Sequence, residues 1–427
     1  MKDSENQWSN GEFFTFRKVP RTGVIYVMSE AGECGYHKEP EQWVNFGQGQ
    51  PEAGDIPGAP PRLTSVALNE INNEYGPVAG TSDLKEAVAD FYNRTYRKGQ
   101  SSKYGPENVA ISPGGRAGLT RVAAALGNLN LGHFLPDYTA YEELLGSFKS
   151  FTSIPILLEP ERQYEFSLKE LRKEIGGRGL GGLLLSNPCN PTGKLISGEE
   201  LEGWVNICRN MKCMLIVDEF YSRYIWDPVL AHKTNPQVSA AEYVKDVNRD
   251  PVLLIDGLTK NWRYPGWRVS WTVGPEKVIE AISSAGSFLD GGASHPMQTA
   301  ALSLMNHEHC QMETKAIQSH FSKKRQLLLN GLADLGVEVE LEPQGTFYIW
   351  GNLRNLPPQI SNSMDFFKAG LQEKIITVPG EFFDVNPGRR RYGRPSRFKH
   401  HTRFSFGPST EEIQEGLRKI KKMIQHY

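Results

Sequence analysis

The sequence predicts an α/β protein in which a large, mostly parallel sheet is covered by helices on both faces, together with a smaller α+β domain. Short apolar runs alternate with helical patterns between residues 109 and 273, which is typical of parallel strands buried on both faces. Polar residues follow the ends of several runs, at the edge where open α/β sheets bind ligands. After Pro296 the pattern changes to longer helices and scattered strands, which indicates the second domain.

The chain is long enough for this division, since 427 residues can bury a sizeable core in each of two domains. We expect residues 1–60 to be an N-terminal segment that belongs to the small domain. Residues 61–305 are expected to form the large domain, and residues 306–427 the small C-terminal domain.

The composition is that of an ordinary globular chain, with 39% hydrophobic and 23% charged residues. A formal net charge of −1 gives no general attraction to nucleic acid or membranes, so we expect neither as a partner. The first ten residues are polar and carry no apolar signal core, and no apolar run approaches the ~20 residues that span a bilayer. Five cysteines, an odd number without metal-type spacing, predict reduced thiols, a cytoplasmic location and no metal site.

The N-terminal elements are predicted from short patterns. Residues 24–28 suggest a short strand, and the glycines and prolines of residues 45–61 suggest an irregular loop. Thr64 is a plausible cap for a helix over residues 64–73. Asp83 and Glu86 predict a capping box for a helix that continues to residue 97.

Seven apolar runs are predicted to be strands of the large sheet, with helical patterns between them. They span residues 109–112, 133–135, 152–158, 182–185, 214–217, 252–255 and 268–273. Polar side chains follow four of these runs, namely Tyr138, Asn190, Asp218 with Tyr221, and Lys260. Because the carboxyl ends of parallel strands meet at one edge of a sheet, we expect these side chains to converge on one site.

The smaller domain is predicted from longer helical patterns and a few strands. The helices span residues 298–305, 314–335 and 365–374, and the strands residues 337–341, 346–350, 375–378 and 404–406. Ser409 and Glu412 form a capping box for the last helix, whose apolar residues recur on one face.

Lys260 comes just past the end of a predicted buried strand, a position that suits a reactive amine. A buried lysine loses its charge easily, and a neutral amine forms a Schiff base with a carbonyl group. Arg268, eight residues further on, carries a planar guanidinium group that suits a phosphate. On this stretch alone, a solvated loop lysine remains the alternative.

Three motifs, in this order, make the sequence resemble the class I/II aminotransferases, which are fold-type I enzymes dependent on pyridoxal phosphate. They are Asn-Pro-Cys-Asn-Pro-Thr-Gly at residues 187–193, Asp-x-x-Tyr at residues 218–221, and Lys260 with an arginine eight residues later. The resemblance runs from about Gly47 to the C-terminus. It implies the fold-type I transferase fold and pyridoxal 5'-phosphate as the cofactor.

The resemblance implies a role for each matched residue around the cofactor ring. Lys260 would be the catalytic amine that binds the cofactor and then moves the proton. Asp218 would pair with the ring nitrogen, so that the ring can take up negative charge. Tyr221 and Asn190 would hydrogen-bond the phenolic oxygen, and Tyr138 would stack on the ring.

The same resemblance implies a phosphate site and a substrate site. Phosphate contacts would come from a helix N-terminus and from an arginine, and the residues are Gly115, Arg116, Thr259 and Arg268. Tyr75 would reach the phosphate of a neighbouring subunit, which implies a homodimer with shared active sites. Arg403 would bind the substrate α-carboxylate, and Gly49 and Asn190 would line the substrate pocket.

Two positions depart from the family pattern at the phosphate site. Gly257 stands where a serine usually precedes the lysine by three residues, although Thr259 is nearby. Arg116 stands where a small or hydroxyl residue is more common, and we expect it to replace the lost hydroxyl contact.

The resemblance implies transfer of the amino group of an L-amino acid to a 2-oxo acid by ping-pong chemistry. One alternative is a lyase, cyclase or oxidase that acts on an amino acid with the same scaffold, and another is a regulator that uses the fold to bind an effector. The aromatic residues Trp262, Trp267, Phe347 and Tyr348 favour a neutral or aromatic substrate. The basic run over residues 389–399 is either a solvated face or an anion site.

Overall fold

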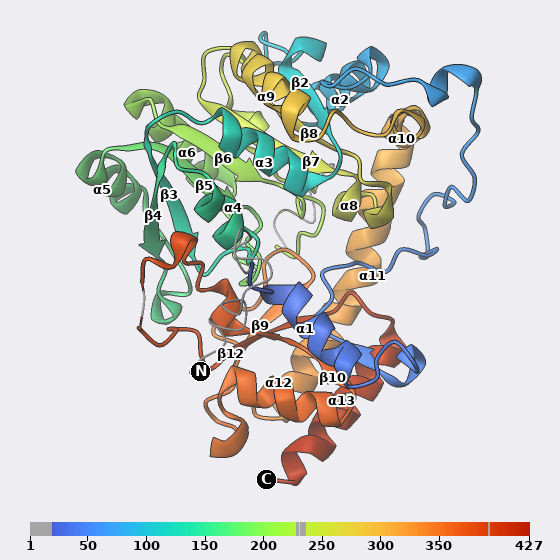
Figure 1. Ribbon diagram of the computed structural model, residues 1–427, viewed down its shortest axis with the longest axis vertical. Helices are drawn as coiled ribbons and strands as arrows, with labels where there is room; N and C mark the ends of the chain where they lie inside the picture. The colour runs from blue at the N-terminus through green and yellow to red at the C-terminus, as the bar shows by residue number, and fades with distance from the viewer. Residues whose placement is uncertain (1–18, 228–229, 231–235, 392) are drawn as a thin grey trace, which may run out of the picture.

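The computed structural model describes residues 19–227, 230, 236–391 and 393–427. A large sheet fills the upper half of the molecule in Figure 1, and a smaller sheet lies in the lower half. The long helix α11 (His307–Asp334) runs along one side from the upper half to the lower. The polar residues 1–10, which carry no apolar signal core, lie outside the described residues.

The large sheet has seven strands, whose spatial order is β2-β8-β7-β6-β5-β3-β4. Their bounds are β2 (Val109–Ser112), β3 (Asn130–Leu135), β4 (Thr152–Leu157), β5 (Leu180–Ser186), β6 (Met214–Asp218), β7 (Val252–Gly257) and β8 (Ser270–Val273). Neighbours from β4 to β7 pair in parallel, whereas β8 pairs antiparallel with both β7 and β2. The predicted mostly parallel sheet is therefore confirmed.

Helices cover both faces of this sheet, as the continuous burial of its strands requires. Gly118 of α3 lies against Ile255 and Thr272 on one face. Trp271 points to the opposite face, since side chains alternate along a strand, and its indole N–H donates to Tyr92 of α2. The helices of this part are α2 (Ser82–Tyr96), α3 (Gly115–Ala125), α4 (Tyr141–Ser147), α5 (Leu168–Arg178), α6 (Gly198–Met211), α8 (Leu258–Asn261), α9 (Glu276–Leu289) and α10 (His295–Ala301).

The lower half is built from both ends of the chain. A three-stranded antiparallel sheet has the order β11-β12-β9, with β9 (Tyr348–Asn352), β11 (Val378–Pro379) and β12 (His401–Ser405). A second, two-stranded sheet pairs β1 (Val44–Asn45) in parallel with β10 (Ile375–Ile376), so the N-terminal segment joins the C-terminal one. The remaining helices are α1 (Gly23–Glu33), α12 (Ser363–Gln372) and α13 (Thr410–Gln425), the last with the predicted capping box at Ser409. The domain boundaries at residues 60/61 and 305/306 stay a prediction.

Two predictions near the N-terminus were wrong. Residues 24–28 belong to helix α1, because Val27 and Ala31 are buried one turn apart, and this spacing suits a helix. Residues 64–73 form only a 3₁₀ turn at Glu70–Asn73, capped by Asn69. Leu68 and Ile71 are exposed, so this stretch has no buried face to stabilise a longer helix.

Two smaller expectations also need correction. Residues 337–341 form no strand, because Glu338 alone bridges to Asn352. The helix predicted from Asp83 begins at Ser82 after Thr81, and no side chain caps it.

Within the described ranges, no helix combines the length and the apolar character needed to cross a membrane.

Candidate active site

A cavity of about 350 Å³ opens at the carboxyl edge of the large sheet. Its walls carry Lys260 and every predicted cofactor residue except Tyr75. The lining residues are Gly115, Arg116, Leu119, Tyr138, Ser186, Asn190, Asp218, Phe220, Tyr221, Thr259, Lys260 and Arg268. The structure thus brings together residues that are up to 153 positions apart, because the strands that precede them are neighbours in one sheet.

Lys260 lies in the single turn of α8, directly after β7. Burial lowers the pKa of its ammonium to about 7, and the positive charges of Arg403, Arg268 and Arg116 act in the same direction. Its Nζ donates a hydrogen bond to the carbonyl oxygen of Gly49. An amine with this pKa is largely neutral at slightly alkaline pH and can attack a carbonyl group.

Asp218 is the last residue of β6 and is buried. Tyr141 Oη donates to its Oδ2 at 2.9 Å, and the backbone N–H of Phe220 donates to its Oδ1 at 3.4 Å. Burial raises the pKa of this carboxyl group to about 6, although both hydrogen bonds and Lys260 oppose the shift. A carboxylate held in this way can bind a cationic N–H group in the cavity.

Two further predicted ring contacts are held by side chains from the lower sheet. Asn190 Oδ1 accepts from Arg403 Nη1 at 2.9 Å, which leaves the amide NH₂ of Asn190 to donate to a ligand. Tyr221 Oη lies 2.9 Å from Tyr348 Oη. Both residues are buried, so their donors have fixed directions.

An anion site lies on the side of the cavity formed by α3 and Arg268. Helix α3 begins at Gly115 without a side-chain cap, so its first N–H groups are left for a ligand. Gly114 has φ 95°, and a Cβ there would lie 2.1 Å from Nη2 of Arg268, so only glycine lets the guanidinium group approach this turn. The hydroxyl of Thr259 is buried and has no partner among the described residues. These groups fit a phosphate.

The structure explains why Gly257 replaces the serine of the family pattern. A Cβ on Gly257 would lie 2.6 Å from Cα of Ser270 and 2.7 Å from the carbonyl oxygen of Val269. Both are backbone atoms of the chain that pairs with β7, so they cannot move aside. The unpartnered hydroxyl of Thr259 is the group that remains for the contact. Arg116, the other departure, lines the same cavity and donates from Nε to Tyr138 Oη at 3.3 Å.

Arg403 lies on β12 and is buried against the cavity residues. Its Nη2 donates to the carbonyl oxygen of Gly47 at 2.9 Å, and its guanidinium carbon lies 4.0 Å from the ring centre of Tyr348. Nε is buried without a partner among the described residues. Gly49 joins the same group through its bond from Lys260, and a Cβ on it would lie 3.1 Å from Tyr348 Oη.

Some predicted residues lie elsewhere. Tyr75 is fully exposed and does not reach the cavity of its own chain. The described residues of the basic run, 389–391 and 393–399, do not line the cavity, and Arg391 pairs with Asp384 at 2.5 Å. Trp262 and Phe347 are buried and do not line the cavity themselves, although the Phe347 ring packs edge-on against Tyr221 with the ring centres 5.5 Å apart.

Several contacts that hold the site residues in place were not predicted from the sequence. Tyr141 holds Asp218, Ser186 accepts from the backbone N–H of Asn190 at 3.1 Å, and Tyr348 holds Tyr221. Tyr141 follows Tyr138 by three residues and Ser186 directly precedes the Asn-Pro motif, so their sequence positions were usable signals. The contact of Tyr348 with Tyr221 had no such signal in the sequence, because it joins two sheets.

Comparisons with known proteins agree with this geometry. The family model for aminotransferase class I and II matches residues 41–420. A probable aspartate/prephenate aminotransferase of Aquifex aeolicus is 24% identical over 386 residues, which are 90% of this chain and 91% of that protein. An aspartate aminotransferase of Sulfurisphaera tokodaii is 26% identical over 395 residues, 89% of this chain and 90% of that one.

A solved structure shares the fold. Aspartate aminotransferase from Thermus thermophilus with maleate superposes with a TM-score of 0.77 at 20% identity, over 96% of this chain and 100% of that one. The family match covers most of the chain, and the cavity is lined by an amine, a carboxylate and groups that can bind a phosphate. This chain therefore belongs to the class I and II aminotransferases and is a pyridoxal-phosphate-dependent enzyme that moves an amino group from an amino acid to a 2-oxo acid.

Proposed function

We propose that Lys260 is the catalytic base of this transfer and that the neighbouring residues bind the cofactor as the sequence predicted. The observation that carries the proposal is the lysine pKa of about 7 in a cavity that also holds Asp218 and Arg268. Pyridoxal phosphate, when bound, supplies an aldehyde for the amino group and a ring that takes up negative charge. Lys260 Nζ, in its neutral form, would accept the α-proton of the amino acid and would later give a proton back.

The remaining residues orient the reactants. Asp218 would accept a hydrogen bond from the ring nitrogen, and Asn190 with Tyr221 would hold the phenolic oxygen. Tyr138 would cover one ring face, and Gly115, Arg116, Thr259 and Arg268 would hold the phosphate. A lyase, cyclase or oxidase is not favoured, because the matched family and the relatives are aminotransferases. A regulator that binds an effector is disfavoured for the same reason.

The lysine pKa predicts how the apoprotein takes up its cofactor. Only the neutral amine attacks an aldehyde, so the rate of covalent attachment should rise as the pH rises through about 7 and level off above it. Stopped-flow absorbance of the apoprotein mixed with pyridoxal phosphate measures this rate. A rate that still rises through pH ~10, the ordinary range of lysine, would contradict the proposal.

Arg403 is proposed to bind the substrate α-carboxylate through two parallel hydrogen bonds. Arg403→Lys keeps the charge and loses the planar fork, so we expect KM for the amino donor to rise between about ten- and one hundred-fold. Steady-state kinetics with a fixed 2-oxo acid checks this. An unchanged KM would show that the substrate α-carboxylate does not bind to Arg403.

L-aspartate is the first amino donor that we propose, because the relatives in Aquifex and Sulfurisphaera carry aspartate in their names. Of the four aromatic residues, Phe347 and Tyr348 both contact Tyr221, and Tyr348 also contacts Arg403. A panel that compares aspartate, phenylalanine and alanine under identical conditions ranks them. Exclusive use of phenylalanine would refute aspartate.

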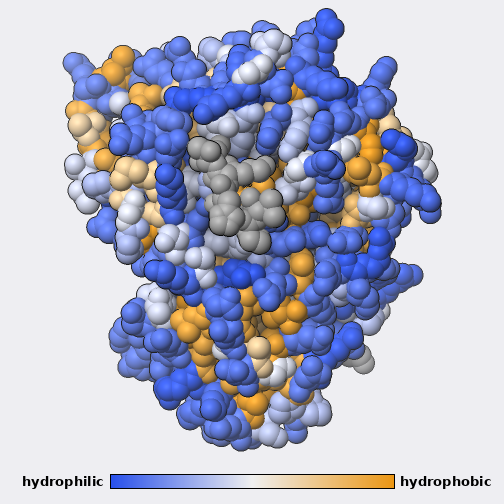
Figure 2. Space-filling view, turned by 180° about the vertical axis from the view of Figure 1, so that it is seen from behind, coloured by the Kyte–Doolittle hydropathy of each residue, from blue (hydrophilic) through white to orange (hydrophobic). Residues whose placement is uncertain are grey.

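A homodimer with shared active sites is supported by the exposed segment around Tyr75. Leu68 and Ile71 of the same segment are also exposed, and large exposed apolar side chains in one region often mark an interface. The segment over residues 61–75 runs along the right edge of Figure 1. Figure 2, which is turned by 180°, shows hydrophobic areas at the corresponding left edge.

Hybrid dimers test whether Tyr75 acts across the interface. One subunit carries Lys260→Ala and the other Tyr75→Ala, so a shared arrangement leaves one complete site. We expect the hybrid to show the activity of one wild-type site, well above half the activity of the Tyr75→Ala homodimer. If the hybrid showed only half the activity of the Tyr75→Ala homodimer, Tyr75 would act in the active site of its own chain.

The cytoplasmic location remains part of this proposal. All five cysteines are free, which is usual in reducing compartments.

A further inference from the structure

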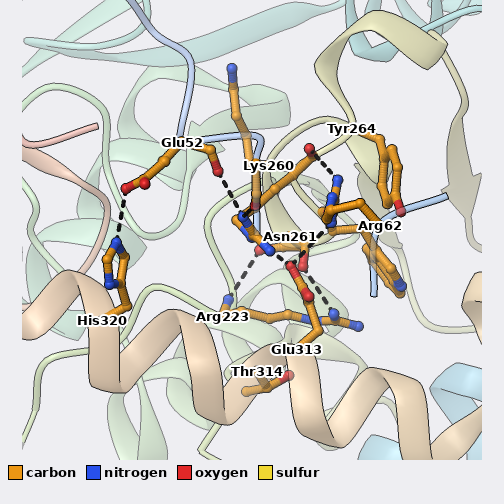
Figure 3. A network of polar contacts seen from close by, with 12 residues as sticks. Glu52, Arg62, Arg223, Lys260, Asn261, Tyr264, Glu313, Thr314 and His320 are labelled. Atoms are coloured by element: carbon orange, nitrogen blue, oxygen red, sulfur yellow. Dashed lines mark hydrogen bonds and ion pairs between the residues drawn. The ribbon is translucent and has the colours of Figure 1, made fainter. Parts of the chain in front are cut away.

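A buried ion pair lies directly behind the lysine turn. Arg263 follows Lys260 by three residues and has φ 58°, a left-handed backbone conformation that non-glycine residues seldom adopt. Its Nε lies 2.6 Å from Oε1 of Glu313, and both side chains are completely buried. Figure 3 shows Glu313 projecting from α11 toward the lysine turn, while the side chain of Lys260 extends away from that helix.

Arg263 also holds a loop that contacts both functional cations. Its Nη1 donates to the carbonyl oxygens of Glu52 at 2.8 Å and Gly54 at 2.6 Å. The same loop, residues 47–54, supplies the carbonyl oxygen of Gly49 to Lys260 and that of Gly47 to Arg403. One guanidinium group therefore joins the lysine turn, α11 and the loop that contacts the proposed base and the proposed carboxylate binder.

A second set of contacts fixes the loop to the same helix. Glu52 Oε2 lies 2.8 Å from His320 Nε2, as Figure 3 shows, and it also lies 2.8 Å from Lys324 Nζ. Glu313, His320 and Lys324 follow one another at spacings of seven and four residues, which places them along one face of α11. The loop is thus held at two places. Arg263 binds backbone carbonyl groups of the loop, and side chains of α11 bind the carboxylate of Glu52.

Net stability does not explain the Arg263–Glu313 pair. Exchanging a buried ion pair for apolar side chains of similar volume often costs a protein little or nothing. Arg62 remains beside Glu313 at 3.7 Å, but it has its own acceptors, the carbonyl oxygens of Trp262 and Arg263. The distinctive property of Arg263 is its rigid fork, which fixes three acceptors relative to one another.

We propose that Arg263, paired with Glu313, is a positioning residue that fixes the loop over residues 47–54 against Lys260 and Arg403. This inference deepens the proposed function and rests on the roles proposed there for these two residues. With the loop fixed, Arg403 is held by Gly47 in the direction needed for a bidentate carboxylate. When the loop is loosened, substrate binding should weaken, whereas the chemistry at Lys260 should change little.

Two variants of the holoenzyme test this positioning role. Arg263→Met with Glu313→Met removes both charges and leaves neither one buried alone. Arg263→Lys keeps the charge but has a single donor nitrogen in place of the planar fork, whose Nε binds Glu313 and whose Nη1 binds the loop carbonyls. In both we expect KM for the amino donor to rise about tenfold with kcat changed less than about threefold. Hydrogen exchange of the backbone amides in residues 47–54 should accelerate at least about tenfold, a readout that needs no activity.

A matched control separates positioning from stability. Arg209 and Asp250 form another largely buried pair, with Nε 2.7 Å from Oδ1, next to the start of β7 and outside the cavity lining. Arg209→Met with Asp250→Met should leave KM and the exchange of residues 47–54 unchanged. Unchanged KM and exchange in the folded Arg263 variants, or an equal effect in the control, would overturn the inference. If the wild-type enzyme failed to transaminate, the proposed function would be wrong, but hydrogen exchange of residues 47–54 would still show whether Arg263 holds the loop. The failure of the proposed function and the failure of this inference are therefore distinguishable.

Discussion

Lys260→Ala is expected to abolish covalent attachment of the cofactor and to lower kcat by at least roughly 10⁴-fold. The substitution removes the one amine among the described residues that line the cavity, and with it both the proposed nucleophile and the proposed proton carrier. The fold should persist, because the side chain makes a single hydrogen bond within the described part of the chain, to the carbonyl oxygen of Gly49. Borohydride reduction followed by mass spectrometry measures the attachment, and steady-state kinetics measures kcat.

Lys277→Ala provides the matched control, since Lys277 is exposed on α9 and lies outside the cavity lining. It should keep full attachment and full activity. If Lys260→Ala protein still carried the cofactor covalently after reduction, another amine would be the attachment site, and the role of Lys260 would be refuted.

Asp218→Asn is expected to lower kcat by roughly 10²–10³-fold with little change in the fold. The amide is nearly the same size as the carboxylate, and its Oδ1 can still accept the hydrogen bond from Tyr141. It cannot stabilise a protonated ring nitrogen by charge, so the ring should take up negative charge less readily. Steady-state kinetics with saturating substrates checks the fall.

Tyr141→Phe is the graded companion to this variant, because it removes only the hydroxyl that donates to Asp218 Oδ2. We expect it to lower kcat far less than Asp218→Asn does. A loss of less than about tenfold in Asp218→Asn would show that the carboxylate is not required at the ring, and the assignment of Asp218 would then fall.

The central sheet was predictable because its strands are short, continuously apolar and separated by amphipathic helices. This pattern reflects burial on both faces, which is a local property of each strand. The residues at the strand ends were predictable for the same reason, since each follows its own strand and the sheet brings the ends together. Lys260, Asp218 and Asn190 all line one cavity.

The failures arose where local pattern and tertiary packing disagree. Residues 24–28 have the β-branched composition of a strand, yet the burial of Val27 and Ala31 favours a helix. Residues 64–73 begin with a residue that can cap a helix, Thr64. Their apolar side chains Leu68 and Ile71 are exposed, so no buried face stabilises an α-helix there.

The supporting contacts of the site were not predictable from one sequence. Arg263 meets Glu52 211 positions away and Glu313 50 positions away, and no spacing rule connects them. The contact between Tyr221 and Tyr348 likewise joins two sheets. Such pairs depend on how distant elements pack against one another, and local sequence motifs carry no information about that packing.

The half-reaction tests the central assignment most directly. Holoenzyme mixed with an amino acid, with no 2-oxo acid present, should convert its cofactor to the pyridoxamine form and release one 2-oxo acid per site, after which the reaction stops. Addition of a second 2-oxo acid should restore the original absorbance. Continued release of product and ammonia without a second substrate, or an unchanged cofactor spectrum with every amino acid tested, would contradict assignment of this chain as an aminotransferase.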